Sequence, residues 1–170
     1  MTILKILTFP HPILRQKADL VTRFDDKLKQ LAADMGATMY EAPGVGLAAN
    51  QIGVLQQLIV IDISREEEEK EYFVLVNPVI THEEGCEVDE EGCLSVLEYT
   101  AKVKRFTHIH VTAQNLNGKT FGFDAEDRFA RIIQHEIDHL HGKLFIDRIS
   151  SLKRNLYKKK LKKILRSEAA

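Results

Sequence analysis

Apolar residues recur at three- and four-residue steps in three stretches of the chain, which is the spacing of amphipathic helices. The helices predicted from this pattern are Asp25–Ala42, Ala125–Leu140 and Ser150–Arg166. Asp25 or Asp26 can cap the first helix, and the pair Pro43–Gly44 follows its end as a stop signal. Helices are therefore expected near both ends of the chain, with one between them.

Four shorter segments have the Val and Ile content or the alternation of β-strands: Leu58–Ile63, Tyr72–Val76, His108–Gln114 and Thr120–Phe123. Asn117–Gly118, between the last two, is a strong hairpin signal, and the charged stretch Arg65–Glu71 suits an exposed connection. This order predicts an α+β fold, with mainly antiparallel sheets packed around a central helix and with N-terminal and C-terminal helices.

The chain has 170 residues, of which 44% are hydrophobic and 29% are charged, as in an ordinary globular protein. We expect residues 1–150 to form a single domain and residues 151–170 to form a basic helix that is part of it or a docking extension. The net charge is +7 over the last segment and −8 over the rest. No apolar run approaches the ~18 residues of a membrane span, and no export signal is evident. A cytoplasmic protein with no membrane association is therefore expected.

The predicted helix at 125–140 contains the motif HExxH as His135, Glu136 and His139. Since one helical turn separates the two histidines, both imidazoles can bind one divalent metal, and Glu136 can reach a water on that metal. The alternative is a solvated polar face with capping histidines. If the metal reading holds, residues 1–150 are a single catalytic metallohydrolase domain.

A catalytic site of this kind needs a third protein ligand. A metzincin-type protease would require His at position 145, where the chain has Phe145, and the acids beyond His139 are only Asp147 and Glu168. Cys93 can complete a Cys/His/His set. We expect Cys86, by contrast, to be an ordinary buried apolar residue.

Three segments taken together, GVGLAANQ at 44–51, EGCLS at 91–95 and QHEIDHLHG at 134–142, closely resemble those of peptide deformylase. That enzyme family removes the N-formyl group from nascent bacterial polypeptides. The resemblance spans nearly the whole chain, and three ordered motifs are far more specific than HExxH alone.

The resemblance implies a metal bound by Cys93, His135 and His139, usually Fe²⁺, with Zn²⁺, Ni²⁺ or Co²⁺ also able to occupy the site. A metal-bound water would attack the formyl carbon of an N-formylmethionyl nascent peptide and release formate, with Glu136 as general acid/base. Gln51 and the backbone amide of Leu94 would hold the oxyanion.

Substrate contacts are less clearly marked in the sequence. The candidates for an apolar pocket that takes the methionine side chain are Val45, Gly46, Leu97, Ile132 and His135. The alternative for Ile132 is core packing, and Arg105 is either a contact for the peptide or a solvated surface residue. Leu97 departs from the family, which often has Pro there, and the role of Arg128 is open.

Two questions remain open at the sequence level. The basic segment 151–170 can be a solvated docked helix, a ribosome contact through RNA phosphates, or a membrane-surface helix. The motifs also fit two other classes, another small metallopeptidase and a non-catalytic RNA-associated metal protein. A structural zinc site normally has four protein ligands, which weakens the last reading.

Overall fold

The computed structural model describes residues 1–169 of the chain, so Ala170 lies outside the described residues. Its helices are α1 (Asp26–Glu41), α2 (Asp127–Leu140) and α3 (Ser151–Ala169), with short 3₁₀ turns η1 (Pro12–Arg15), η2 (Ala49–Ile52) and η3 (Phe145–Arg148). Its strands are β1 (Gly46–Ala48), β2 (Leu58–Ile61), β3 (Phe73–Glu84), β4 (Glu87–Cys93), β5 (Val96–Arg105), β6 (His108–Gln114) and β7 (Thr120–Glu126).

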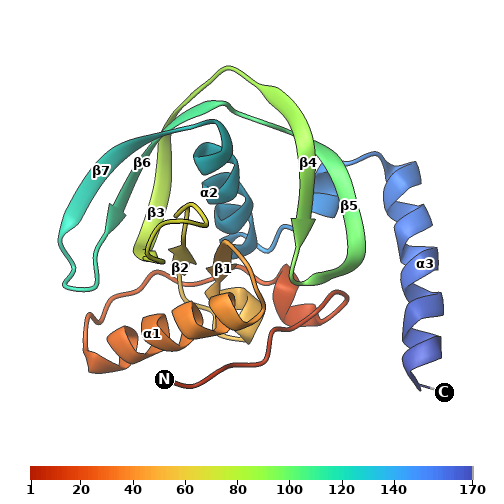
Figure 1. Cartoon of the computed structure of the whole chain (residues 1–170), viewed down its shortest axis with the longest axis horizontal. Coiled ribbons are helices and arrows are strands. Elements are labelled where there is room, and N and C mark those ends of the chain that lie inside the picture. Colours follow the sequence, from red (N-terminus) through yellow and green to blue (C-terminus); the bar gives the residue numbers. More distant parts are fainter. Residues whose placement is uncertain (170) are drawn as a thin grey trace.

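Five strands form one antiparallel sheet in the order β1-β2-β3-β6-β7, and β4 pairs with β5 in a separate hairpin. Helix α2 lies between the sheet and the hairpin, and α1 packs below β1 and β2 (Figure 1). The predicted α+β class, with antiparallel sheets around a central helix, is confirmed.

The sheet is buried on both faces near β2, which explains the unbroken apolar run of that strand. Ile59 and Ile61 belong to the core that α2 shares with the sheet, whereas Leu58 and Val60 belong to the core under α1. Successive side chains of a strand point to opposite faces, so a strand covered on both faces reads as continuously apolar. Both cores therefore meet in β2.

The predicted helix boundaries agree with the structure to within a few residues. Helix α2 begins at Asp127 rather than Ala125 because Ala125 and Glu126 still pair with β6. Gly142, two residues after the end of α2, has a φ of +74° and donates its N–H to the carbonyl of His139. A side chain there would meet the backbone oxygen of Arg15 at 2.5 Å, so glycine is required.

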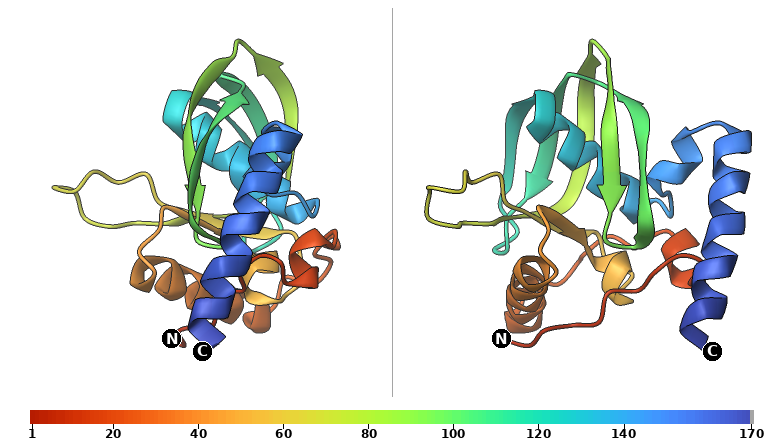
Figure 2. Two further views of the ribbon diagram at one scale, coloured as in Figure 1. Left: turned by 90° about the vertical axis from the view of Figure 1, so that its right-hand side faces the viewer. Right: turned by 45° about the vertical axis from the view of Figure 1, so that its right-hand side comes forward.

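Strand β3 is much longer than the predicted Tyr72–Val76, and the sequence prediction is wrong there. The register with β6 shifts between Val76 and Val79, where Asn77 has a φ of +51°. Proline is tolerated in a strand at such a bulge, and Pro78 lies inside it. The charged segment Arg65–Glu71 is exposed as expected, in the loop that projects between β2 and β3 (Figure 2).

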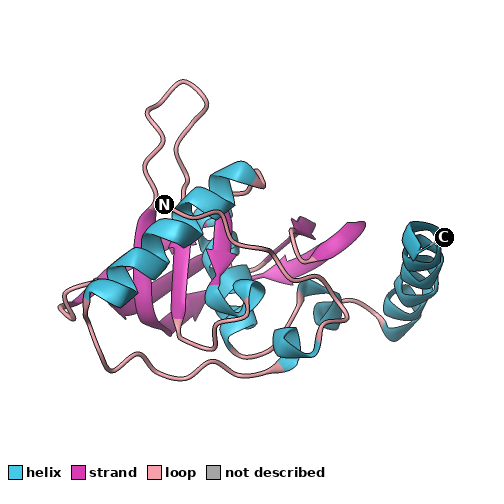
Figure 3. Cartoon of the chain, turned by 90° about the horizontal axis from the view of Figure 1, so that it is seen from below, coloured by secondary structure: helices cyan, strands magenta, loops and turns pink. Residues whose placement is uncertain are grey.

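Helix α3 lies along the edge of the molecule (Figures 2 and 3), on the side where β5 lies (Figure 1). Tyr157 and Leu161 are its buried residues and join a core cluster with Val96, Val103 and Phe145. Most of its other side chains face solvent. Among residues 1–169, no helix is long and apolar enough to cross a membrane.

Tyr157 carries much of the contact between α3 and the rest of the fold. Its ring stacks on Tyr99 at a centroid distance of 4.5 Å, and its hydroxyl donates to the carbonyl oxygen of Leu97 at 3.0 Å. We expect Tyr157→Ala to lower the free energy of unfolding by about 3–5 kcal/mol, because truncating a buried aromatic leaves a cavity.

The neighbouring Leu156, which is 57% exposed, offers a matched control. Leu156→Ala is expected to change the free energy of unfolding by no more than about 0.5 kcal/mol. Urea unfolding of both variants, with the protein in one metal state throughout, measures the difference. Equal losses in the two variants would contradict the role given to Tyr157.

Candidate metal centre

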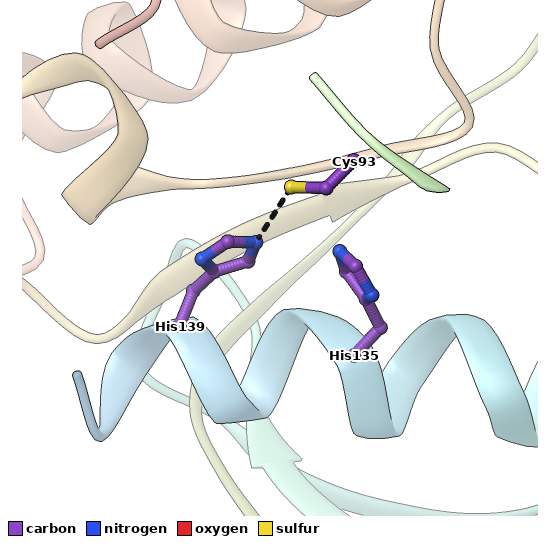
Figure 4. Close-up of side chains that lie close together, drawn as sticks. All are labelled: Cys93, His135 and His139. Atoms are coloured by element: carbon purple, nitrogen blue, oxygen red, sulfur yellow. Dashed lines mark hydrogen bonds between the residues drawn. The ribbon is translucent and has the colours of Figure 1, made fainter. Parts of the chain in front are cut away.

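Two elements that are distant in sequence bring three ligating side chains together. Helix α2 supplies His135 and His139 one turn apart, and the end of β4 supplies Cys93 (Figure 4). One ligand atom from each lies within 4.8 Å of the other two, and the Cys93 Sγ is 3.4 Å from His139 Nε2. One sulfur and two imidazole nitrogens in this arrangement form a donor set for a single transition-metal ion.

A carboxylate fixes the orientation of one imidazole. His135 Nδ1 lies 2.9 Å from Glu91 Oε1, and both side chains are nearly buried. This bond engages Nδ1, so Nε2 is the nitrogen available to a metal. Metal-binding histidines usually donate their second ring nitrogen to a carboxylate in this way.

Glu91 is itself held by two arginines. Arg105 donates to it through Nε at 2.8 Å and Nη2 at 2.9 Å, and Arg131 donates through Nη1 at 2.7 Å. Burial alone raises the pKa of Glu91, but the hydrogen bonds from Arg105 and His135 outweigh it and lower the pKa to about 2. The carboxylate beside His135 is therefore ionised at neutral pH.

The donor set also fits a cation electrostatically. Burial, aided by the charge of His135, holds the pKa of His139 well below its ordinary value, so this ring is in the neutral form that metals bind. Burial opposes protonation of His135, but Cys93 and Glu91 outweigh it and hold its pKa well above the ordinary value. The groups around His135 therefore favour a positive charge at this point. A bound divalent ion would supply such a charge.

Glu136 lies beside the ligands with one oxygen unpartnered. Its Oε2 is buried and has no hydrogen-bond partner among the described residues. Burial raises the pKa of Glu136 to about 7, against the opposing charge of His135. A Cβ at Gly46 would lie 2.7 Å from Oε1, so the absence of a side chain at Gly46 makes room for this carboxyl group. An acid with a pKa near neutrality is suited to proton transfer.

Gln51 faces the ligands from η2 with its amide orientation fixed. Its Oε1 accepts from the Ala48 N–H at 2.9 Å, so Nε2 points the other way. That nitrogen donates to Ser95 Oγ at 3.0 Å and lies 3.7 Å from Cys93 Sγ. Leu94 follows Cys93 in the turn between β4 and β5. Both predicted oxyanion groups therefore border the ligand set.

These groups line a cleft of about 990 Å³ between α2, β4 and the segment before β1. The expected pocket residues Val45, Gly46, Ile132 and His135 are in its wall, together with Gln51, Leu94, Cys93 and Glu136. Arg128, whose role the sequence left open, also lines it. Ile132 is both a cleft residue and a core residue, because its side chain belongs to the cluster between α2 and the sheet.

Three expectations from the sequence need correction. Leu97 is not among the residues that line the cleft, and its backbone carbonyl accepts a hydrogen bond from Tyr157 of α3. The side chain of Arg105 is 2% exposed and pairs with Glu91 and Asp138, so it is neither at the cleft nor solvated. Cys86 is exposed rather than buried.

Glu91 and Tyr99 were not singled out from the sequence as site residues. Tyr99 lines the cleft, and Glu91 orients His135. A signal for Glu91 was present: it stands two residues before Cys93 on one strand, and alternate strand residues share a face. An acid on the same face as a metal ligand is a candidate partner for a neighbouring histidine.

Comparison with known proteins agrees with this geometry. Residues 3–155 match the family described as polypeptide deformylase. The peptide deformylase of Desulfotalea psychrophila is 56% identical over 164 residues, which cover 96% of this chain and 97% of that protein. That of Acidobacterium capsulatum is 48% identical, covering 98% of each chain.

Solved structures show the same fold over nearly the whole length. A peptide deformylase from Legionella pneumophila superposes with a TM-score of 0.91 at 46% identity, covering 99% of this chain and 98% of that one. One from Ehrlichia chaffeensis has a TM-score of 0.93 at 32% identity, covering 99% and 100%. The chain therefore belongs to the polypeptide deformylase family, metal-dependent hydrolases that act on N-formylmethionyl peptides.

Proposed function

We propose that this protein hydrolyses the N-terminal formyl group of formylmethionyl nascent peptides and releases formate. The observation that carries the proposal is the placement of Glu136, a buried acid with an unpartnered oxygen, beside the cluster of Cys93, His135 and His139 in the wall of one cleft. Family membership supports the same reaction.

Cys93, His135 and His139 would hold the ion, which is Fe²⁺ in our proposal, with Zn²⁺, Ni²⁺ or Co²⁺ able to replace it. Mixed thiolate and imidazole donors suit several of these metals. When bound, a divalent ion supplies a Lewis acid that polarises the formyl carbonyl and lowers the pKa of water. Glu91, by its bond to His135 Nδ1, keeps that ring turned toward the ligand cluster.

Glu136 moves the protons. We assign to its carboxylate the acceptance of a proton from the attacking water and the transfer of that proton to the departing amine. A pKa of about 7 lets the same group act as base and then as acid near neutral pH. A side chain at position 46 would displace the carboxyl group of Glu136. Glycine at this position therefore leaves that group its place at the cleft.

Gln51 and Leu94 would stabilise the oxyanion of the tetrahedral intermediate. Gln51 can present an N–H from Nε2, whose orientation Ala48 fixes, and Leu94 can present its backbone N–H from the turn after Cys93. Each donor aimed at the developing charge is worth roughly 3 kcal/mol of transition-state stabilisation.

The methionine side chain is assigned to the apolar part of the cleft at Val45 and Ile132. The peptide beyond it would extend along β4, whose hydrogen-bonded partner in its two-stranded sheet is β5. An extended peptide can pair with such an edge through backbone groups, with little dependence on later side chains. A metallopeptidase that cleaves unformylated peptides is the competing candidate.

Helix α3 is proposed as the contact with the ribosome, in the cytosol where nascent chains emerge. Tyr157 and Leu161 anchor it to the rest of the fold, so we treat residues 1–150 and 151–170 as one domain. Its exposed lysines, Lys158, Lys159, Lys162 and Lys163 among them, face solvent. A row of solvated cations is suited to RNA phosphates.

Formate release from a short N-formylmethionyl peptide tests the reaction. We expect release by metal-loaded protein, none by metal-stripped protein, and no cleavage of the unformylated peptide. Glu136→Ala should lower kcat by at least about 100-fold, the usual contribution of general acid–base catalysis, while the bound metal content is unchanged. Full activity in Glu136→Ala would refute the assigned role, and cleavage of the unformylated peptide would favour the peptidase.

Glu91→Gln tests the support of the metal ligands. Loss of the charge that orients His135 should weaken metal binding about 10–100-fold, measured by competition with a chelator. Asp89→Asn is the matched control, because Asp89 is an exposed acid on the same strand. Equal affinities for the two variants, both shown to be folded by circular dichroism, would contradict the positioning role of Glu91.

Charge reversal tests ribosome contact more cleanly than truncation, since truncation would remove the buried Tyr157 and Leu161. Lys159→Glu with Lys163→Glu should weaken co-sedimentation with ribosomes at low salt and leave formate release from a short peptide unchanged. Lys27→Glu with Lys29→Glu on α1 makes the same change of charge elsewhere. The same binding in both double variants would argue against a contact through α3.

A further inference from the structure

Two buried polar atoms outside the cleft, one of them on a metal ligand, have no partner among residues 1–169. They are Oδ1 of Asn50 and Nδ1 of His139. Asn50 is fully buried and His139 is 1% exposed, and neither residue lines the cleft, so a bound substrate cannot satisfy them. Buried polar groups in native proteins are nearly always bonded to the protein or to an internal water. Each of these two atoms therefore requires a partner.

Asn50 and His139 lie on elements that pack against each other. His139 is on the last turn of α2, and Asn50 belongs to η2, which contacts α2. The Nδ2 of Asn50 donates to the backbone oxygen of Gln16 at 2.9 Å. Gln16 lies against Gly142, where a Cβ would come 3.3 Å from the Gln16 carbonyl carbon, and Gly142 donates its N–H to the carbonyl of His139. The amide of Asn50 is therefore at the end of α2 that carries His139.

The bonds that these two side chains already make determine which atom is the donor and which is the acceptor. A backbone carbonyl only accepts, so Asn50 presents its NH₂ group to Gln16 and its Oδ1, an acceptor, points elsewhere. His139 presents Nε2 to the ligand cluster, 3.4 Å from Cys93 Sγ. A metal on Nε2 leaves the one proton of the neutral ring on Nδ1, which is then a donor. The two unpartnered atoms are therefore complementary.

The two metal-binding histidines differ in how their second ring nitrogen is held. His135 Nδ1 is bonded to the carboxylate of Glu91, whereas His139 Nδ1 has no such partner among residues 1–169. Metal-binding histidines almost always donate this N–H to a carboxylate, a carbonyl or a water, and the bond fixes the orientation of the ring. Outside the cleft, Asn50 Oδ1 is the buried side-chain acceptor that is still unpartnered.

We propose that Asn50 positions His139 through one buried water molecule, which accepts from His139 Nδ1–H and donates to Asn50 Oδ1. The two atoms are not in direct hydrogen-bond contact, and buried waters commonly link polar groups of this kind. Asn50 is then a positioning residue that keeps His139 Nε2 directed at the metal, as Glu91 does for His135. The inference rests on the metal centre of the proposed function.

The test compares two variants that both lose the hydrogen bond to Gln16. Asn50→Leu keeps the branched shape of the side chain but has no acceptor, whereas Asn50→Asp keeps an oxygen that accepts from the water. We expect Asn50→Leu to weaken Zn²⁺ binding about 10–100-fold in competition with a chelator, as loss of an outer partner of a metal ligand does. Asn50→Asp should bind Zn²⁺ at least as tightly as the parent, because a carboxylate is a stronger acceptor than an amide.

Gln57→Met is the matched control for loss of a buried amide. Gln57 is 8% exposed and donates to the backbone oxygen of Ala18 in the same N-terminal segment, but it does not line the cleft. Gln57→Met should lower the free energy of unfolding of metal-free protein and leave the Zn²⁺ affinity of folded protein unchanged. Equal affinities for the parent and Asn50→Leu, or the same loss in Asn50→Leu and Asn50→Asp, would overturn the proposal. Circular dichroism first shows that each variant is folded.

Nuclear magnetic resonance of the Zn²⁺-loaded parent tests the water without any substitution. The proton on His139 Nδ1 should give a cross-relaxation peak to a bound water. A His139 ring that is protonated on Nδ1 and shows no such peak would overturn the proposal, whether or not the Asn50 variants fold. A parent that binds no divalent metal would refute the metal centre itself, so the two failures are distinguishable.

Discussion

The buried carboxylate of Glu91 joins the β4–β5 hairpin to helix α2, and the metal centre depends on that junction. Within one strand, Glu91 is two residues from Cys93, and it accepts hydrogen bonds from Arg105 of β5 and from His135 and Arg131 of α2. Ionised groups inside a protein are costly unless they are fully paired. Each of these pairs therefore constrains the hairpin to one position against the helix.

That constraint continues past the ligands. Arg105 also donates to Asp138 on the last turn of α2, and Arg148 of η3 pairs with the same carboxylate. Burial raises the pKa of Asp138, but Arg148 and Arg105 outweigh it and hold the pKa below its ordinary value. The charges alternate along this chain of contacts, so every buried ion has an opposite neighbour. This pairing offsets the cost of burying the charges. It also holds α2 against the hairpin at two points, His135 and Asp138.

The local parts of this arrangement were predictable from the sequence and the long-range parts were not. His135 and His139 are one turn apart on a helix with a clear apolar stripe, so their common direction follows from helical geometry alone. The hairpin β4–β5 was not predicted as strands, since Glu87–Glu91 is mostly charged and shows no alternation. The partners of Glu91 across the fold hold it against α2, and no local pattern contains them.

The same reason explains the errors over single residues. Arg105 reads as a surface arginine because its sequence neighbours Lys102 and Lys104 are charged, yet its partners lie 14 and 33 positions away. Leu97 reads as a cleft residue because it follows EGCLS, but Tyr157 draws its carbonyl toward α3. In both cases a contact formed only by tertiary folding determines where the residue lies.

Ile132 shows how the cleft and the core share one helix. Its side chain is 8% exposed, packs in the cluster between α2 and the sheet, and still forms part of the cleft wall. A rigid wall requires dense packing behind it, and that packing also supplies the hydrophobic stabilisation of the fold. Ile132 is therefore both a core residue and a pocket residue. The contacts that pack α2 against the sheet stabilise the protein, and they also hold His135 and His139 in place.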